Sequence, residues 1–249
     1  MDISATTRTV VKRTHALITP DGYISSVIPG WTGCTPIVVI SEQMGAGFSQ
    51  VIASFREADG AIRGTTLQSQ LFCYVVEGKV KAAAGDATEE LSRGQFVYIP
   101  PGTNYDLRNT VKGGQLLIFS KVYALLEGTA MPGVLFGDAA EAPADAVLND
   151  PAVRMQVLLP DNLGFDMAVN ILTYDPGGYL PLVETHIMEH GLLYLRGQGI
   201  YRLGEDWYPV KKGDSIWMGP YCQQWFTAMG KEPAVYIYYK NVNRFPGAL

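Results

Sequence analysis

Short runs of apolar residues, separated by Gly, Pro, Asn and Asp, recur along the chain. Runs of this length that are rich in Val, Ile, Tyr and Phe are typical of sandwich and barrel folds. Eight of them are predicted as strands: Gln50–Phe55, Phe72–Val76, Gln95–Ile99, Leu116–Ser120, Met167–Leu172, Leu192–Leu195, Ser215–Met218 and Val235–Tyr239. Helical periodicity is weak, and a short helix is expected only at Ala139–Leu148. The pattern therefore predicts an all-β protein.

The hydrophobic pattern occurs twice. Gly78 in Glu-Gly-Lys-Val is followed by Gly94 after sixteen residues, and Gly197 in Arg-Gly-Gln-Gly is followed by Gly213 at the same interval. Gly78 and Gly197 lie 119 residues apart, as do Gly94 and Gly213. Self-similarity at a fixed offset indicates two copies of one structural unit.

Each copy has a glycine hairpin, a polar excursion, a second glycine and a strand that ends in Pro-Pro-Gly or Gly-Pro. This order describes antiparallel strands that form a double-stranded β-helix, or jelly-roll barrel, with few short helices. We expect an N-terminal barrel in residues 1–140 and a C-terminal barrel in residues 150–249, joined by a linker rich in Ala and acidic residues.

Composition narrows the function classes. The formal net charge is −5 and no basic tract exceeds Lys211-Lys212, so nucleic-acid binding is not expected. No apolar stretch approaches the roughly 18 to 20 residues of a membrane helix. The three cysteines, Cys34, Cys73 and Cys222, are odd in number and form no C-x-x-C pair. They predict neither disulfides nor a thiolate zinc site, and a cytoplasmic protein is expected.

One motif in the second half carries metal-binding residues: Gly178, then Glu184 and His186, then His190 after three residues and Gly197 after six. Further on, Gln224 follows Gly213 and Gly219. These spacings resemble the two signature motifs of the cupin family, with the first histidine and the glutamate of the first motif exchanged, as Glu184 and His190, and the histidine of the second motif replaced by Gln224. The resemblance implies a bicupin, in which two cupin barrels lie in tandem.

The chemistry of these residues supports a metal site in the C-terminal barrel. Glu184 and His186 are two apart on a strand and so share a face, and His190 at an even separation joins them. A carboxylate, two imidazoles and the Gln224 amide suit Mn²⁺, Fe²⁺, Ni²⁺, Co²⁺ or Zn²⁺, and Mn²⁺ fits the oxygen-rich set well. The alternative is that Glu184 and His186 form a solvated pair on a strand and that His190 is a hydrogen-bonded core residue.

The first half keeps the glycine frame without the ligands. The offset of 119 places Thr65, Leu67, Leu71 and Tyr105 where ligands would be, and this set is no credible metal site. One metal ion per chain is therefore expected, with the N-terminal barrel metal-free and serving a structural or oligomerising role.

The last predicted strand points to a substrate anion. Tyr236, Tyr238 and Lys240 alternate onto one face, and an inward lysine persists where an anion neutralises it. A substrate carboxylate is the hypothesis, and Tyr201 is expected to reach the same cavity. Because the offset also maps Lys121 onto Lys240, a structural ion pair is the alternative for both lysines.

The remaining candidates are expected to be structural. His15 lies outside both motifs, and Trp217 and Trp225 are expected to belong to the core rather than to contact a ligand.

Several segments together resemble the (S)-ureidoglycine aminohydrolase family, a bicupin family of purine catabolism. They are His-Ala-Leu-Ile-Thr-Pro-Asp-Gly from His15, Glu-Thr-His-Ile-Met-Glu-His-Gly from Glu184, Leu-Arg-Gly-Gln-Gly-Ile-Tyr-Arg-Leu from Leu195, Trp-Tyr-Pro-Val-Lys-Lys-Gly-Asp from Trp207, Ile-Trp-Met-Gly-Pro from Ile216 and Tyr-Lys-Asn-Val-Asn-Arg from Tyr239. The likeness covers nearly the whole chain and is strongest from about residue 164 onward.

The resemblance implies a manganese enzyme that releases ammonia from (S)-ureidoglycine, formed from allantoate, to give (S)-ureidoglycolate. It implies metal binding by Glu184, His186, His190 and Gln224, and substrate binding by Tyr201, Gln224, Tyr236 and Lys240. Glu184 and Lys240 are the expected catalytic residues. A small-molecule substrate and a homo-oligomer are the expected partners.

Two other functions stay open at this point. Two histidines and one carboxylate also describe the facial triad of non-haem iron dioxygenases, which consume oxygen. A non-catalytic bicupin that binds a small molecule is the second alternative.

Overall fold

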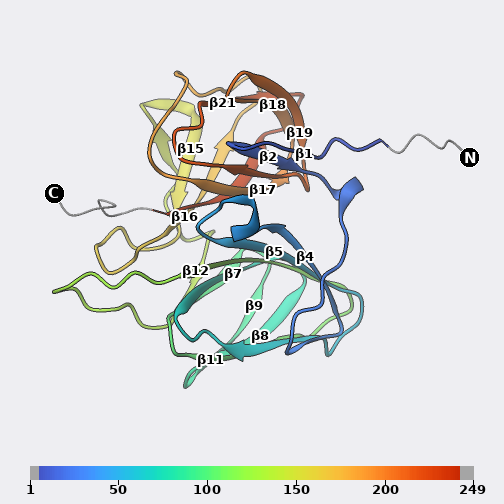
Figure 1. The fold of residues 1–249 in the computed structure, drawn as a ribbon, viewed down its shortest axis with the longest axis vertical. Coiled ribbons are helices and arrows are strands. Elements are labelled where there is room, and N and C mark those ends of the chain that lie inside the picture. The colour runs from blue at the N-terminus through green and yellow to red at the C-terminus, as the bar shows by residue number, and fades with distance from the viewer. Residues whose placement is uncertain (1–5, 242–249) are drawn as a thin grey trace, which may run out of the picture.

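The computed structural model describes residues 6–241, and within them the regular structure consists of β-strands and two 3-10 helices, η1 (Pro20–Gly22) and η2 (Glu42–Met44). The all-β prediction is confirmed, and all eight predicted segments lie in strands apart from Met167, which immediately precedes one. In this part of the chain no helix is long and apolar enough to cross a membrane. Figure 1 shows two barrels stacked against each other, the first in blue and green and the second in yellow to red.

The N-terminal barrel consists of a six-stranded and a five-stranded sheet, both antiparallel throughout. In spatial order the six-stranded sheet contains β13 (Leu135–Asp138), β10 (Gln95–Ile99), β7 (Ser69–Glu77), β12 (Gln115–Val122), β5 (Ser49–Phe55) and β4 (Cys34–Ile40). The five-stranded sheet contains β3 (Trp31–Thr32), β6 (Ala61–Thr65), β11 (Asn104–Asn109), β8 (Lys79–Ala84) and β9 (Ala87–Ser92).

The C-terminal barrel has a large and a small antiparallel sheet. The described residues form an eight-stranded sheet of β1 (Val10–Val11), β2 (His15–Ile18), β20 (Ser215–Met218), β17 (His190–Arg196), β22 (Ala234–Lys240), β16 (Ala168–Tyr174), β15 (Asp150–Val157) and β14 (Asp145–Val147). The three-stranded sheet opposite contains β19 (Asp206–Lys211), β18 (Gln198–Leu203) and β21 (Gln224–Met229).

Alternation along the central strands divides the core into three layers. On β12, Leu116 and Ile118 point into the N-terminal barrel, whereas Leu117 and Phe119 pack against the other barrel. On β22, Tyr236 faces the interior of the C-terminal barrel, and Ile237 and Tyr239 belong to the shared layer. The six- and eight-stranded sheets are therefore buried against each other, because both faces of their central strands are apolar.

The first strands of the chain belong to the second barrel. β2 pairs with β20 in the register Ala16↔Trp217, and β1 pairs with β2. Figure 1 shows these dark blue strands beside the red and brown strands of the C-terminal barrel. The expected division placed the whole of residues 1–140 in the N-terminal barrel, and strands β1 and β2 depart from it. The sequence repeat does not reveal this, because it contains no pairing information between distant segments.

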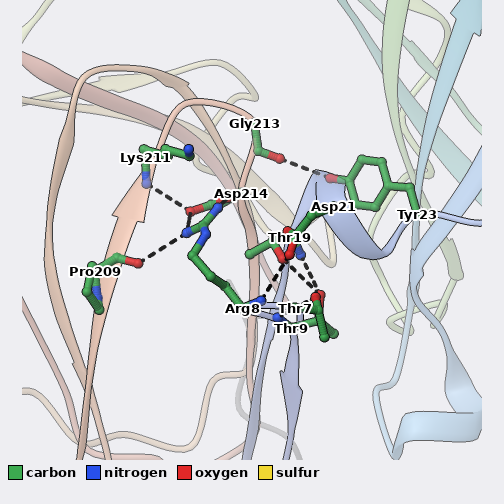
Figure 2. A network of polar contacts seen from close by, with 10 residues as sticks. All are labelled: Thr7, Arg8, Thr9, Thr19, Asp21, Tyr23, Pro209, Lys211, Gly213 and Asp214. Carbon is green, nitrogen blue, oxygen red and sulfur yellow. Dashed lines mark hydrogen bonds and ion pairs between the residues drawn. The ribbon is translucent and has the colours of Figure 1, made fainter. Parts of the chain in front are cut away.

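Polar contacts fasten this N-terminal segment, which we call the strap (residues 7–23), to the C-terminal barrel (Figure 2). The Arg8 guanidinium binds both carboxylate oxygens of Asp214, at 2.8 and 2.6 Å, and the Asp214 side chain is fully buried. The Tyr23 hydroxyl donates to the carbonyl oxygen of Gly213 at 2.9 Å. The strap thereby covers an edge of the eight-stranded sheet that would otherwise be unpaired.

The helix expected at Ala139–Leu148 is wrong. The segment makes turns around Asp138, whose carboxylate accepts the N–H of Ala140, and it then forms β14, which pairs with β15. Pro143 lies in the middle of the segment and has no N–H for a helical hydrogen bond. Pairing with a neighbouring strand therefore prevails over the helix propensity of the alanines.

Candidate metal centre and substrate cavity

A cavity of about 200 Å³ opens into the C-terminal barrel. All seven of the predicted site residues line it: Glu184, His186, His190, Tyr201, Gln224, Tyr236 and Lys240. Its other walls are mostly apolar and include Leu172, Leu180, Leu192 and Met218. Charged and polar groups thus converge within a small, largely hydrophobic space, which is typical of small-molecule sites.

Strand pairing brings the site residues to one level of the barrel. His190 begins β17 and stands opposite Lys240 at the end of β22. Gln224 begins β21, and its backbone exchanges two hydrogen bonds of 2.9 Å with Glu184. Residues that are far apart in sequence are therefore fixed by neighbouring backbone pairs, and only their side chains adjust.

The two imidazoles have defined tautomers. Nδ1 of His186 lies 3.1 Å from the carbonyl oxygen of Met188, and Nδ1 of His190 lies 3.2 Å from that of Tyr239. A carbonyl oxygen only accepts, so both Nδ1 atoms carry a proton, and in the neutral form of each ring Nε2 keeps a lone pair. The two Nε2 atoms are 3.2 Å apart. Two lone pairs that face each other at this distance fit a shared cation, and metal-binding histidines commonly donate Nδ1–H to a carbonyl.

Gln224 and Glu184 differ in their positions relative to the two imidazoles. The Gln224 side-chain nitrogen Nε2 lies 2.7 Å from His186 Nε2, so the amide is beside the pair but must rotate to present its oxygen to a metal ion. Glu184 lines the same cavity, but among residues 6–241 no three His, Cys, Asp or Glu side chains form a closed ligand group. The preformed part of the donor set is therefore the two histidines, and Gln224 and Glu184 complete it only after side-chain movements.

Burial sets the protonation of the ionisable groups. Burial and, to a smaller extent, the neighbouring His186 and Lys240 lower the pKa of His190 to about 3, which keeps the ring neutral, as a metal ligand must be. Burial raises the pKa of Glu184, while His186 and Lys240 act in the opposite direction. The cavity thus favours a bound cation or a proton near Glu184.

Tyrosines form one wall of the cavity. The Tyr236 and Tyr174 hydroxyls are 3.0 Å apart, and burial raises the pKa of Tyr201. The Tyr238 hydroxyl accepts from the Asn170 amide at 3.0 Å and donates to the Met155 sulfur at 3.4 Å. A thioether is a weak acceptor, so the phenol retains its capacity to donate to a ligand.

The sequence interpretation left some lining residues out of the site. Tyr238 shares its face with Tyr236 and Lys240, so the alternation alone was sufficient to include it. Val147 and Met155 come from the hairpin of β14 and β15. Nothing in the sequence signals their place in the cavity, because the segment around Val147 resembles a linker.

The expected equivalence of Lys121 and Lys240 is wrong. His190 pairs with Lys240 in one barrel, and its counterpart Leu71 pairs with Ser120 in the other. Ser120 is therefore the residue that matches Lys240. Lys121 points to the opposite face, where its ammonium binds the Asp166 carboxylate at 2.5 Å.

The other first-half positions contain no ligand set. Leu71 belongs to the apolar interior and Tyr105 packs against it, whereas Leu67 is exposed and Thr65 bonds to Asn104. These positions therefore offer apolar packing, an exposed side chain and a hydrogen-bonded hydroxyl rather than a set of metal ligands.

The remaining candidates lie outside the cavity. His15 is buried and its Nε2 lies 3.0 Å from the Tyr208 hydroxyl. The Trp217 indole donates to Glu189 in the layer between the barrels, and Trp225 donates to the carbonyl oxygen of Leu180 at 2.6 Å. These contacts agree with the structural roles expected for them.

Comparisons with known proteins give one consistent result. The cupin domain family matches residues 68–120 and 170–239. The (S)-ureidoglycine aminohydrolase of Arabidopsis thaliana is 35% identical over 98% of this chain and 81% of its own length, and that of Escherichia coli is 36% identical over 95% and 92%. The crystal structure of protein Ylba from E. coli superposes with a TM-score of 0.87 at 33% identity and covers 97% of both chains.

Proposed function

The chain belongs to the (S)-ureidoglycine aminohydrolase family of cupin proteins, and from this membership we propose that it hydrolyses (S)-ureidoglycine to (S)-ureidoglycolate and ammonia with one Mn²⁺ per chain. The observation that carries the proposal is the convergence of two imidazoles, an amide, a carboxylate and a lysine on one small cavity. The family resemblance alone would not say whether the necessary side chains come together.

The metal part of the proposal concerns the donor set. His186, His190, Gln224 and Glu184 would hold the ion, and the paired Nε2 lone pairs support this assignment. The set contains nitrogen and oxygen but no thiolate, which suits Mn²⁺. Bound there, a divalent ion would supply Lewis acidity and orient the substrate.

The substrate part concerns Lys240 and the tyrosines. Lys240 lines the cavity beside His190, its partner on the neighbouring strand, and its ammonium would neutralise the substrate carboxylate. Tyr201 and Tyr236 would contact the ureido group, and Gln224 would contribute to substrate as well as metal. The metal ion and Lys240 would together fix groups attached to the central carbon of the substrate. Water would then reach that carbon from one face only, which accounts for stereospecificity.

In the reaction, the bond between the amine nitrogen and the central carbon breaks and a bond from that carbon to the water oxygen forms. Water supplies one proton to the leaving amine, so the products are ammonia and the alcohol. We assign the transfer of this proton to the Glu184 carboxylate, which lines the cavity beside the other proposed ligands.

Ammonia release from freshly prepared ureidoglycine, with and without added Mn²⁺, tests the proposal. We expect Mn²⁺-dependent release, (S)-ureidoglycolate as the product, and no reaction with allantoate, whose second ureido arm does not match so small a cavity. Racemic ureidoglycolate at the uncatalysed rate would contradict the proposal, and Fe²⁺-dependent oxygen uptake would point to a dioxygenase instead.

The proposal extends to the cellular setting. It places the reaction in purine catabolism after allantoate cleavage. The three cysteines, which are all unpaired, support a cytoplasmic location. We also propose a homo-oligomer, which sedimentation velocity would detect.

A further inference from the structure

Strand β17 has one face in the cavity and the other against the N-terminal barrel. His190 and Leu192 line the cavity, whereas Gly191 and Leu193 face the layer between the barrels. Glu189 immediately precedes His190, and its side chain turns toward the N-terminal barrel. The position of His190 therefore depends on what lies behind the strand.

The Glu189 carboxylate is buried between the barrels, and the residue is only 4% exposed. It accepts the backbone N–H of Gly47 at 3.0 and 3.1 Å and the Trp217 indole N–H at 3.3 Å. A Cβ on residue 47 would lie 2.7 Å from Glu189 Oε1, so any side chain there would displace the carboxylate from its present position. The N-terminal barrel thus supplies a backbone donor to the residue beside a proposed metal ligand.

The next residues of the same segment contact the chain on the other side of His190. The Phe48 ring stacks on Tyr239 with 4.0 Å between ring centroids. A Cβ on Gly191 would lie 2.4 Å from the Phe48 ring, so the two segments approach as closely as glycine allows. Tyr239 is the residue whose carbonyl oxygen accepts the His190 Nδ1 proton.

A third contact from the same segment lies further along β17. The Gln50 side-chain amide donates to the carbonyl oxygen of Leu192 at 3.1 Å and lies 3.3 Å from the Ser215 hydroxyl. Residues 47–50 of the N-terminal barrel, which we call the backing segment, therefore contact Glu189, Gly191, Leu192 and Tyr239. These are neighbours of His190 along the strand and across the sheet.

We propose that the backing segment, anchored by the Glu189 carboxylate, positions the His190 imidazole for metal binding. The inference rests on the metal site proposed above. Glu189 is a positioning residue, because it acts through the backbone of His190 and through the Tyr239 carbonyl rather than by touching the ion. The N-terminal barrel, which has no ligand set at the corresponding positions, thereby contributes to the site of its neighbour.

A comparison of two buried carboxylates tests the proposal. Asp166 is also buried between the barrels, binds Lys121 and accepts the N–H of Ala124, yet its contacts do not involve β17. Glu189→Ala and Asp166→Asn therefore both disturb the interface, but only the first removes the support of His190. The dissociation constant of Mn²⁺, measured by competition with a chelator, is the readout.

We expect Glu189→Ala to weaken Mn²⁺ binding about 10-fold, at the lower end of the effect of losing a residue that orients a metal ligand. Asp166→Asn should leave the constant within about twofold, although both variants lower the urea midpoint of unfolding. Glu189→Gln retains an acceptor for the Gly47 N–H and should weaken Mn²⁺ binding only about threefold. If Glu189→Ala does not fold, Glu189→Gln is compared with Asp166→Asn in its place. Equal Mn²⁺ affinity in all folded variants would overturn the proposal.

Nitrogen-15 spectra of the metal-free protein separate failure of this inference from failure of the proposed function. The chain has only three histidines, so their ring signals are resolvable. We expect one Nδ1–H tautomer for His190 in the unaltered protein and a mixture in Glu189→Ala. An unchanged His190 signal would overturn the positioning role whatever the substrate or metal proves to be.

Discussion

The two barrels share a backbone frame but differ in what fills them. In the C-terminal barrel, His190, Gln224 and Lys240 surround a cavity. The residues in the same register of the N-terminal barrel are Leu71, Tyr105 and Ser120, of which Leu71 and Tyr105 pack with an apolar interior. The difference teaches that the glycine frame determines the fold, whereas a few inward positions determine whether a site exists.

The register also shows why a constant sequence offset fails near the end of each barrel. The offset is 119 for Leu71 and His190 but 120 for Ser120 and Lys240. The connection after Ala228 has one residue more than the connection after Asn109. Because side chains alternate along a strand, this slip of one residue moves a lysine from the interior to the opposite face.

The largest effect on the difference between the two barrels is expected from removing the His186 and His190 imidazoles. A His186→Ala, His190→Ala double variant should lose its metal and reduce kcat/KM about 1,000-fold, because several kcal/mol of transition-state stabilisation depend on the ion. Elemental analysis of the purified protein measures the metal. Two equivalents of metal in the unaltered chain, or full retention in the variant, would mean that the N-terminal barrel also binds an ion.

The second test removes the positive charge of Lys240 from the cavity. Lys240→Met should lower kcat/KM about 100-fold, mainly through KM, because a buried substrate carboxylate loses its counter-charge. Steady-state kinetics gives the loss, and metal content should remain at one equivalent. Loss of metal or of the fold in this variant would assign Lys240 a structural role.

The matched change on the other face is Lys121→Met. It leaves the Asp166 carboxylate buried without its cation, although Asp166 keeps the Ala124 N–H and the Gln70 amide. We expect the free energy of unfolding to fall by about 2 kcal/mol, measured by urea denaturation. The kinetic constants of the folded variant should not change. A large rise in KM here would show that the two lysines act together.

The smallest effect is expected from the tyrosine wall. Tyr238→Phe removes a hydroxyl whose acceptor in the structure is the Met155 sulfur. If the phenol donates to the substrate, kcat/KM should fall about 5-fold, corresponding to one neutral hydrogen bond. Ile118 holds the corresponding position in the other barrel, and Ile118→Val serves as a packing control with unchanged kinetics. Equal kinetics for Tyr238→Phe would remove Tyr238 from the substrate site.

Much of the site was predictable because it depends on local rules. Glu184, His186 and His190 follow from motif spacing, and Tyr236, Tyr238 and Lys240 follow from alternation along one strand. The strands themselves followed from short apolar runs between turn residues. Each of these features is encoded within a few neighbouring residues.

The contacts that were not predictable join distant segments. Nothing near Gly47 in the sequence signals its hydrogen bonds to Glu189, and nothing near Val147 signals its place in the cavity. The pairing of β2 with β20 is of the same kind. Such contacts depend on how the two barrels pack, which a pattern within one segment does not record.

The strap has a consequence for the order in which the chain acquires structure on the ribosome. Ala16 pairs with Trp217, so one of the earliest strands to be synthesised must wait for one of the last. The N-terminal barrel can form its own sheets during elongation, because all their strands lie between β3 and β13. Arg8 meets Asp214 only when the second barrel has emerged. Closure of the strap is therefore a late event that is available only to a nearly complete chain, and an interrupted translation product would retain β2 without its partner β20.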